Sequence, residues 1–155
     1  LEFRQRDVAA EIAAVLRGTG LAPQHLDIEL TESVLMHQTG QVLDTLNALK
    51  ALGVSISIDD FGTGYSSLAY LKRYPIDKLK IDRSFVMDTP DNADDVAIVT
   101  AIIQMARSLQ LKTVAEGVQT QAQVELLTEL GCDSMQGFLV SEPMNSKLTM
   151  DWLRN

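Results

Sequence analysis

Acidic and basic side chains recur at four points of the chain where a β-strand is expected to end. The four stretches run over residues 27–32, 55–64, 78–82 and 112–117. Parallel strands bring their carboxyl ends to one edge of a sheet, so these charges meet if the strands are neighbours. Carboxylates gathered around a lysine at that edge would form a metal site with a cationic helper. A single charge at a strand end usually belongs to a solvated loop, but four in the same phase favour a site.

The phase of each strand selects the charges that would meet. Side chains alternate across a strand, so Ile56 and Ile58 share one face and Asp59 lies on the other. The other stretches show the same division, less clearly over residues 112–117. Their apolar faces suit packing against an outer layer of helices. The opposite faces carry the charges that we expect to converge, which are Glu29, Asp59, Lys80 and Glu116.

Simpler interpretations of these charges stay open. The strands could form a half-exposed antiparallel sheet, although the long helical connections between them argue against it. Lys80 could form an interior salt bridge to Asp82 or Glu116, which is compatible with a catalytic role. Because the strand ends carry oxygen ligands and lack histidine, Mg²⁺ or Mn²⁺ suits them better than zinc.

Length and composition indicate one globular domain. The chain has 155 residues, of which 46% are apolar, enough for one core. Its formal net charge of −8 argues against binding a nucleic acid polymer. The sequence shows no apolar run of membrane-spanning length and no signal segment at its start. The single cysteine, Cys132, fits a reducing compartment and is expected to pack as a small apolar residue. We therefore expect a cytoplasmic location.

Helical and strand patterns alternate along the chain. Strands are expected over about 25–30, 54–60, 77–82, 112–116 and 134–139. Helices are expected over about 7–17, 40–52, 66–75, 94–110, 120–131 and 146–153. Gly18, Gly53 and Gly131 should each end a helix. This order predicts an α/β fold with a parallel sheet. Chemistry spread over several strand ends is typical of a (β/α) barrel of about 250 residues, so we expect a partial TIM-type barrel.

Five short motifs occur in order along the chain. They are Glu29-Leu30-Thr31-Glu32, Asp59-Asp60-Phe61-Gly62-Thr63-Gly64-Tyr65-Ser66-Ser67, Lys80-Ile81-Asp82, Ala115-Glu116-Gly117-Val118 and Gln136-Gly137-Phe138. Together they resemble the EAL-domain family, the cyclic di-GMP phosphodiesterases of bacterial signalling. The resemblance spans essentially the whole chain and the later part of that domain. It implies that residues 1–155 are one N-terminally truncated EAL domain, whose Glu-Ala-Leu strand and metal-binding asparagine would lie upstream.

The resemblance also implies a metal site. It contains two ions, Mg²⁺ or Mn²⁺. Its implied ligands in this chain are Glu29, Asp59, Asp60 and Glu116. Asp59 would contact both ions.

Further roles follow from the same resemblance. Lys80 would contact the attacking water or the phosphate, and catalysis would involve Glu116 and Glu32 as well. Glu32 would hold the loop over residues 61–67. Gln136 and Asp82 would bind the substrate.

The implied reaction is metal-dependent hydrolysis of cyclic di-GMP to linear pGpG. The fragment itself should be weak or inactive, because two ligands would lie upstream. The alternative is a catalytically inactive receptor that binds cyclic di-GMP without cutting it. Gln119 departs from the family's usual glutamate, but the other visible site positions keep competent residues, which favours an enzyme.

Expected partners are cyclic di-GMP, a second copy joined through open sheet edges, and upstream sensory or GGDEF-type domains that could anchor the parent protein in a membrane.

Overall fold

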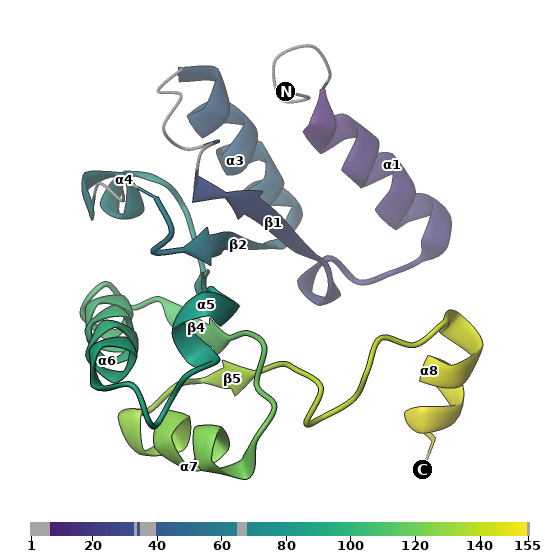
Figure 1. The fold of residues 1–155 in the computed structure, drawn as a ribbon. Coiled ribbons are helices and arrows are strands. Elements are labelled where there is room, and N and C mark those ends of the chain that lie inside the picture. The colour runs from purple at the N-terminus through teal and green to yellow at the C-terminus, as the bar shows by residue number, and fades with distance from the viewer. Residues whose placement is uncertain (1–6, 33, 35–39, 65–67, 155) are drawn as a thin grey trace.

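A five-stranded parallel sheet organises the chain (Figure 1). The computed structural model describes residues 7–32, 34, 40–64 and 68–154. Its strands are β1 (Asp27–Thr31), β2 (Ser55–Phe61), β3 (Lys78–Ile81), β4 (Lys112–Ala115) and β5 (Ser134–Met135), in the order β1-β2-β3-β4-β5. Its helices are α1 (Val8–Thr19), η2 (Pro23–His25), α3 (Gly40–Leu52), α4 (Leu68–Arg73), α5 (Arg83–Val86), α6 (Ala93–Ser108), α7 (Gln121–Leu130) and α8 (Ser146–Trp152). The predicted α/β class is confirmed, and the antiparallel alternative is wrong.

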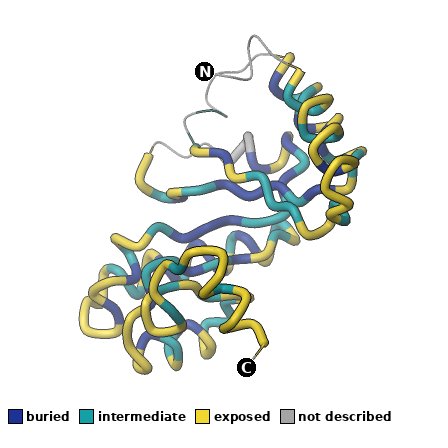
Figure 2. The backbone as a smooth tube through the Cα atoms, turned by 90° about the vertical axis from the view of Figure 1, so that its right-hand side faces the viewer, coloured by how far each residue is buried: buried dark blue, intermediate teal, exposed yellow. Residues whose placement is uncertain are grey.

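The core lies between one face of the sheet and the helices that connect its strands. Leu30 of β1 pairs with Ile58 of β2, which pairs with Leu79 of β3, and all three side chains are buried. The helices add Leu46 of α3 and Ile103 of α6 to the same cluster. Figure 2 shows the buried backbone following the strands, with exposure on the outer helices and the C-terminal segment. The apolar phase of the strands therefore faces the helices, as predicted.

A β-bulge interrupts the pairing of β2 with β3. The register shifts between Ile58 and Phe61, so Asp59 and Asp60 together lie opposite Lys80 alone. Asp60 adopts the left-handed conformation, with φ of 54°. A bulge adds one residue to its strand and redirects the side chains that follow it. Strict alternation would turn Asp60 toward the helices, but the bulge frees it from that face and returns Phe61 to the core.

Helix ends follow the glycine pattern with one exception. Gly53 and Gly131 follow α3 and α7 with positive φ, as predicted. The expectation that Gly18 ends the first helix is wrong. α1 continues to Thr19, and Gly20, with φ of 72°, donates its N–H to the Leu16 carbonyl instead.

β3 and β5 are shorter than predicted by two residues or more, whereas β1 and β4 are each shorter by one residue. β3 ends at Ile81, because Asp82 caps the short helix α5, which the sequence pattern did not predict. β5 covers two residues rather than about six. The chain turns at Gly137, where a Cβ would lie only 2.1 Å from the Val118 carbonyl oxygen, so a side chain cannot be accommodated. The predicted start of the helix near residue 66 lies outside the described residues.

The C-terminal segment stands apart from the sheet. α8 lies at the end of a long connection (Figure 1) and contains no buried residue. Its Leu148 and Trp152 side chains are about half exposed. Cys132, by contrast, packs against the core as predicted. Within the described residues, no helix combines the length and apolar character needed to cross a bilayer.

Truncating Leu46 should test the position of the core. Leu46→Ala removes a fully buried side chain, so we expect the free energy of unfolding to fall by about 2–5 kcal/mol. Leu21→Ala makes the same change at an exposed position and should cost less than about 0.5 kcal/mol. Denaturant titration monitored by circular dichroism would compare the two variants. Equal losses would contradict the assigned core.

Candidate active site

The ammonium group of Lys80 lies at the centre of three carboxylates. Its Nζ is 2.8 Å from Glu29 Oε1, 2.8 Å from Asp59 Oδ1 and 2.8 Å from Glu116 Oε1. The partners come from β1, β2 and the residue after β4, and Lys80 itself from β3. The four charges selected by strand phase therefore meet as predicted. Of the two simpler partners for Lys80, Glu116 makes the salt bridge; no Lys80–Asp82 pair occurs among the described contacts.

Burial and pairing oppose one another at Lys80. Its side chain is only 7% exposed, and burial alone disfavours the ammonium ion. Hydrogen bonds to Asp59, Glu116 and Glu29 outweigh that penalty and raise the pKa of Lys80. Lys80 therefore stays charged at neutral pH. Burial also raises the pKa of Glu116, which its bond to Lys80 only partly offsets.

Three carboxylates gather beside Lys80. Asp59, Asp60 and Glu116 each offer an oxygen, and these atoms lie within 4.8 Å of one another. Burial raises the pKa of Asp60, and the nearby Asp59 charge adds to the effect. Such a set of hard oxygen donors fits a divalent cation such as Mg²⁺ or Mn²⁺. Glu29 contacts Lys80 but does not belong to this group of three.

Gln136 lies against the same carboxylates. Its Nε2 donates a 2.6 Å hydrogen bond to Glu116 Oε1. Its backbone N–H donates to the Ala115 carbonyl, and its carbonyl accepts from Val118 N–H. These bonds hold residue 136 beside the end of β4, although β5 has already ended. Asp82 lies on the adjacent strand end, where its bonds from Ser84 lower its pKa despite partial burial.

Glu32 is half-buried, and its carboxylate group lies inside the protein. Both of its carboxylate oxygens are inaccessible and lack a hydrogen-bond partner among the described residues. A Cβ built on Gly64 would lie 3.2 Å from Glu32 Oε1, so the loop after β2 runs directly past this carboxylate. An unpaired buried carboxylate is costly. This geometry is consistent with the expected contact between Glu32 and the loop over residues 61–67. Residues 65–67 of that loop lie outside the described part of the chain.

A second layer of polar contacts lies below the site, on the same face of the sheet. Asp27 accepts a 2.8 Å hydrogen bond from Ser57 Oγ and a 2.6 Å bond from Lys78 Nζ. Each of these residues precedes a site residue by two positions on its strand. The face of the sheet that carries the site is therefore polar at two successive levels along the strands. The apolar core lies on the opposite face, against the helices.

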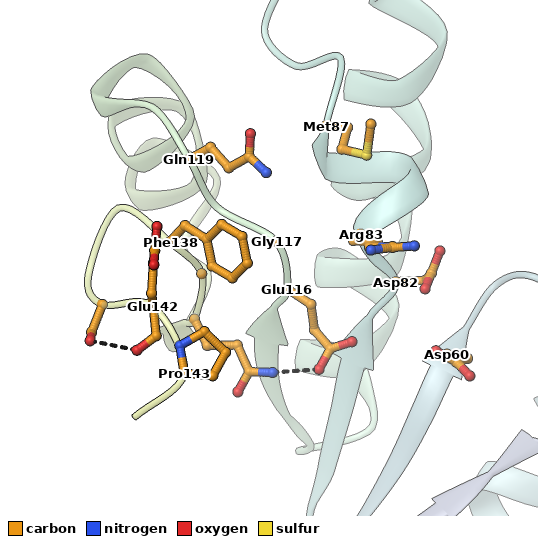
Figure 3. A pocket seen from close by; sticks show the side chains of 13 residues that line it. Asp60, Asp82, Arg83, Met87, Glu116, Gly117, Gln119, Phe138, Glu142 and Pro143 are labelled. Atoms are coloured by element: carbon orange, nitrogen blue, oxygen red, sulfur yellow. Dashed lines mark hydrogen bonds between the residues drawn. The ribbon is translucent and has the colours of Figure 1, made fainter. Parts of the chain in front are cut away.

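The site opens into a cavity of about 670 Å³, within the range of small-molecule pockets. Asp60, Asp82 and Glu116 line its floor. Figure 3 shows Phe138, Glu142 and Pro143 on one side and Arg83 and Met87 on the other. Phe138 is 60% exposed, so it offers an aromatic face to the cavity rather than a core contact.

Several lining residues were not anticipated from the sequence. Arg83 begins α5, Met87 is the residue that caps its C-terminus, and Glu142 follows the turn after Gly137. A signal for α5 was present, because aspartate and serine commonly cap helices and Asp82 precedes Arg83-Ser84. Nothing comparable points to Glu142, which reaches the cavity through an irregular segment.

Fold and site together define an α/β protein with a cluster of carboxylate oxygens at the carboxyl ends of parallel strands. The family model described as "EAL domain" matches residues 2–143. The chain belongs to the EAL domain family, and solved EAL structures match its fold. Its five-stranded parallel sheet is consistent with the predicted partial TIM-type barrel.

Among curated relatives, the bifunctional diguanylate cyclase/cyclic di-GMP phosphodiesterase MucR of Pseudomonas aeruginosa is 51% identical over 93% of this chain and 21% of its own length. The cyclic di-GMP phosphodiesterase NbdA of the same organism is 50% identical over 93% of this chain and 18% of its own. The chain thus spans about a fifth of these relatives.

Solved structures support the same placement. The PaMucR phosphodiesterase in complex with c-di-GMP superposes with a TM-score of 0.88 at 50% identity, covering 95% of this chain and 60% of that one. A manganese/cy-diGMP complex of Klebsiella pneumoniae BlrP1 has a TM-score of 0.83 at 35% identity, covering 91% and 36%.

Replacing Lys80 should show how strongly it holds the carboxylates together. Lys80→Met keeps the aliphatic stem but leaves Glu29, Asp59 and Glu116 without their shared cation. We expect the free energy of unfolding in chelator to fall by about 3 kcal/mol, the lower end for breaking a buried pair, because Glu29 is half exposed.

Denaturant titration would measure this loss, with Lys72→Met as the control. Lys72 is exposed in the last turn of α4 and should tolerate the change within about 0.5 kcal/mol. Added Mn²⁺ should stabilise Lys80→Met more than the unchanged chain, because a cation relieves the repulsion. If Lys80→Met leaves the free energy of unfolding unchanged in chelator, the role of Lys80 in holding these carboxylates together is contradicted.

Proposed function

We propose that the chain supplies the metal-binding and substrate-binding residues of a phosphodiesterase that opens cyclic di-GMP to linear pGpG. The observation that carries this proposal is the convergence of Asp59, Asp60 and Glu116 beside Lys80. Two of these carboxylates, Asp60 and Glu116, also line the cavity. The names of MucR and NbdA, and the ligand in the MucR structure, support cyclic di-GMP as the substrate.

Two Mg²⁺ or Mn²⁺ ions are the proposed cofactors. Asp59, Asp60 and Glu116 provide ligands from this chain, and Glu29 is a fourth proposed ligand. Bound divalent ions lower the pKa of water and offset charge that develops on phosphoryl oxygens. The manganese in the BlrP1 complex supports this choice of ion.

The remaining site residues have proposed roles at the phosphate and the base. Lys80, held charged by its carboxylate partners, stabilises negative charge at the phosphoryl group. Gln136 and Asp82 contact the substrate from the cavity floor, and Glu32 fixes the loop after β2. The exposed ring of Phe138 offers a guanine base a face on which to stack.

The proposal also concerns the protein around this chain. We propose that residues 1–155 form the C-terminal portion of one EAL domain, since they cover 60% of the MucR phosphodiesterase chain. The upstream part would complete the ligand set, so the isolated chain would be weak or inactive. MucR is named as bifunctional, which supports an upstream GGDEF-type or sensory partner. A cytoplasmic location follows if the substrate is an intracellular messenger.

A product assay tests this function. The complete EAL domain that contains this chain should convert cyclic di-GMP to pGpG with Mn²⁺ or Mg²⁺, and a chelator should stop the reaction. Asp60→Asn removes one proposed ligand and should lower kcat/KM at least about 10-fold. Chromatographic separation of substrate and product would give the rates.

Asp94→Asn is the matched control, because Asp94 is exposed in the first turn of α6. It should leave the rates unchanged. Binding of cyclic di-GMP without any product would favour the receptor alternative and contradict the enzymatic proposal. A fully active 155-residue chain would contradict the proposed need for upstream ligands.

We also propose that the chain forms a homodimer. β1 and β5 are the edge strands of the described sheet, and unpaired edges favour association. In α8, the apolar side chains of Leu148 and Trp152 are about half exposed. A partner copy would remove this apolar surface from water.

Sedimentation equilibrium tests the homodimer. We expect a species of twice the chain's mass that weakens on dilution. Leu148→Gln in α8 should shift the equilibrium toward monomer, because it makes the exposed apolar face polar. Leu21→Gln, an equal change at a similarly exposed site outside α8, should have little effect. A clean monomer at high concentration would contradict the proposal.

A further inference from the structure

Gln123 is buried, and none of its hydrogen bonds within the described residues reaches Asp59, Asp60 or Glu116. It lies at the third position of α7 and is 2% exposed. A buried side-chain amide is costly unless its donors and acceptor are paired. The way in which this amide is paired connects two walls of the cavity.

All hydrogen-bonding positions of the Gln123 amide are used. Its Oε1 accepts from Gln119 N–H at 2.7 Å and from Thr120 N–H at 3.0 Å. Its Nε2 donates to the carbonyls of Val86 and Met87, each at 3.0 Å. A primary amide offers one oxygen with two lone pairs and two N–H groups, so no further partner is required.

These four bonds join segments far apart in the sequence. Val86 and Met87 form the end of α5, whose segment lines the cavity with Asp82, Arg83 and Met87. Gln119 and Thr120 end the loop that begins at Glu116 and leads into α7. Figure 3 shows Met87 and Gln119 on opposite sides of the cavity. The Gln123 amide therefore fixes the spacing between the α5 wall and the Glu116 loop.

A second contact joins the same walls at their other end. A Cβ built on Gly117, whose φ is +71°, would lie 2.7 Å from the Arg83 Cβ. The loop backbone thus packs directly on the start of α5, where no larger residue fits. With Gly117 packed against Arg83 at one end and Gln123 bonded at the other, the loop is attached to α5 at two points.

We propose that Gln123 is a positioning residue that sets the width of the cavity and, through it, the affinity for a cyclic dinucleotide. This inference rests on the proposed function. Gln123 touches neither substrate nor cation; it acts through the backbone of Gln119 and the carbonyls of α5. Misplacement of a binding wall by about 1 Å can weaken binding and catalysis about 100-fold.

The simpler role for Gln123 is to cap α7, and the conservative variant separates the two roles. Thr120 and Gln123 form a reciprocal capping box, in which glutamate serves as well as glutamine. Gln123→Glu therefore keeps the bonds to Gln119 and Thr120 N–H. It loses both donors to α5 and places a carboxylate against two carbonyl oxygens. A capping role predicts rescue by glutamate, whereas a positioning role predicts loss.

Kinetics of the complete EAL domain with cyclic di-GMP and Mn²⁺ provide the first readout. We expect Gln123→Glu to lower kcat/KM by about 10- to 100-fold, mainly through KM. The assay temperature lies well below the measured Tm of each variant, so that partial unfolding does not imitate the loss. Gln121→Glu is the control, because Gln121 lies exposed on the same helix and should keep both constants near those of the unchanged protein.

Amide hydrogen exchange provides a readout independent of activity. The Met87 and Thr89 N–H groups, which bond back to Arg83 and Val86 of the α5 wall, should exchange faster in Gln123→Glu. Gln119 and Thr120 should stay protected, because the carboxylate still accepts their bonds. Unchanged exchange at Met87 and Thr89, or unchanged KM, would overturn the positioning role. If the complete EAL domain without any substitution neither binds nor cleaves cyclic di-GMP, the proposed function is contradicted instead. Amide hydrogen exchange would then still decide whether Gln123 connects α5 to the loop that begins at Glu116.

Discussion

The shared ion pair of Lys80 is the interaction on which the site depends. Its ammonium group offsets the mutual repulsion of Glu29, Asp59 and Glu116, which would otherwise be strong in a partly buried cleft. These partners lie on β1, on β2 and directly after β4, so the contacts require the sheet order observed here. A strand shifted by one residue would turn its charge toward the helices and lose the contact.

The other features of the cavity are arranged around this pair. The bulge in β2 brings Asp60 beside Asp59, so that consecutive residues serve one oxygen cluster. Gln136 reaches the cluster only because its backbone pairs with the end of β4. Two residues before Glu29 on β1, Asp27 likewise pairs with a lysine of β3, which is Lys78. The interior face of the sheet thus uses polar contacts where the outer face uses apolar packing.

Strand periodicity was sufficient to predict the sheet, the buried face and the convergence of Glu29, Asp59, Lys80 and Glu116. These features depend on alternation, which a single sequence displays. The position of Asp60 could not be derived this way, because a bulge is set by the pairing of two strands. The family resemblance supplied that residue instead. The hydrogen bonds from Gln123 to the carbonyls of Val86 and Met87 likewise could not be predicted from the sequence, since they join segments more than thirty residues apart. Only its capping partner, Thr120, lies close enough to form a sequence pattern.

Locating a bound metal would show whether these strand ends form a cation site. Crystals of the complete EAL domain grown with Mn²⁺ would reveal the ion by its anomalous scattering. We expect a manganese peak about 2 Å from carboxylate oxygens of Asp59, Asp60 and Glu116, with Lys80 still paired beside it. A peak away from this cluster, or none at saturating Mn²⁺, would contradict the assignment of these strand ends as a cation site.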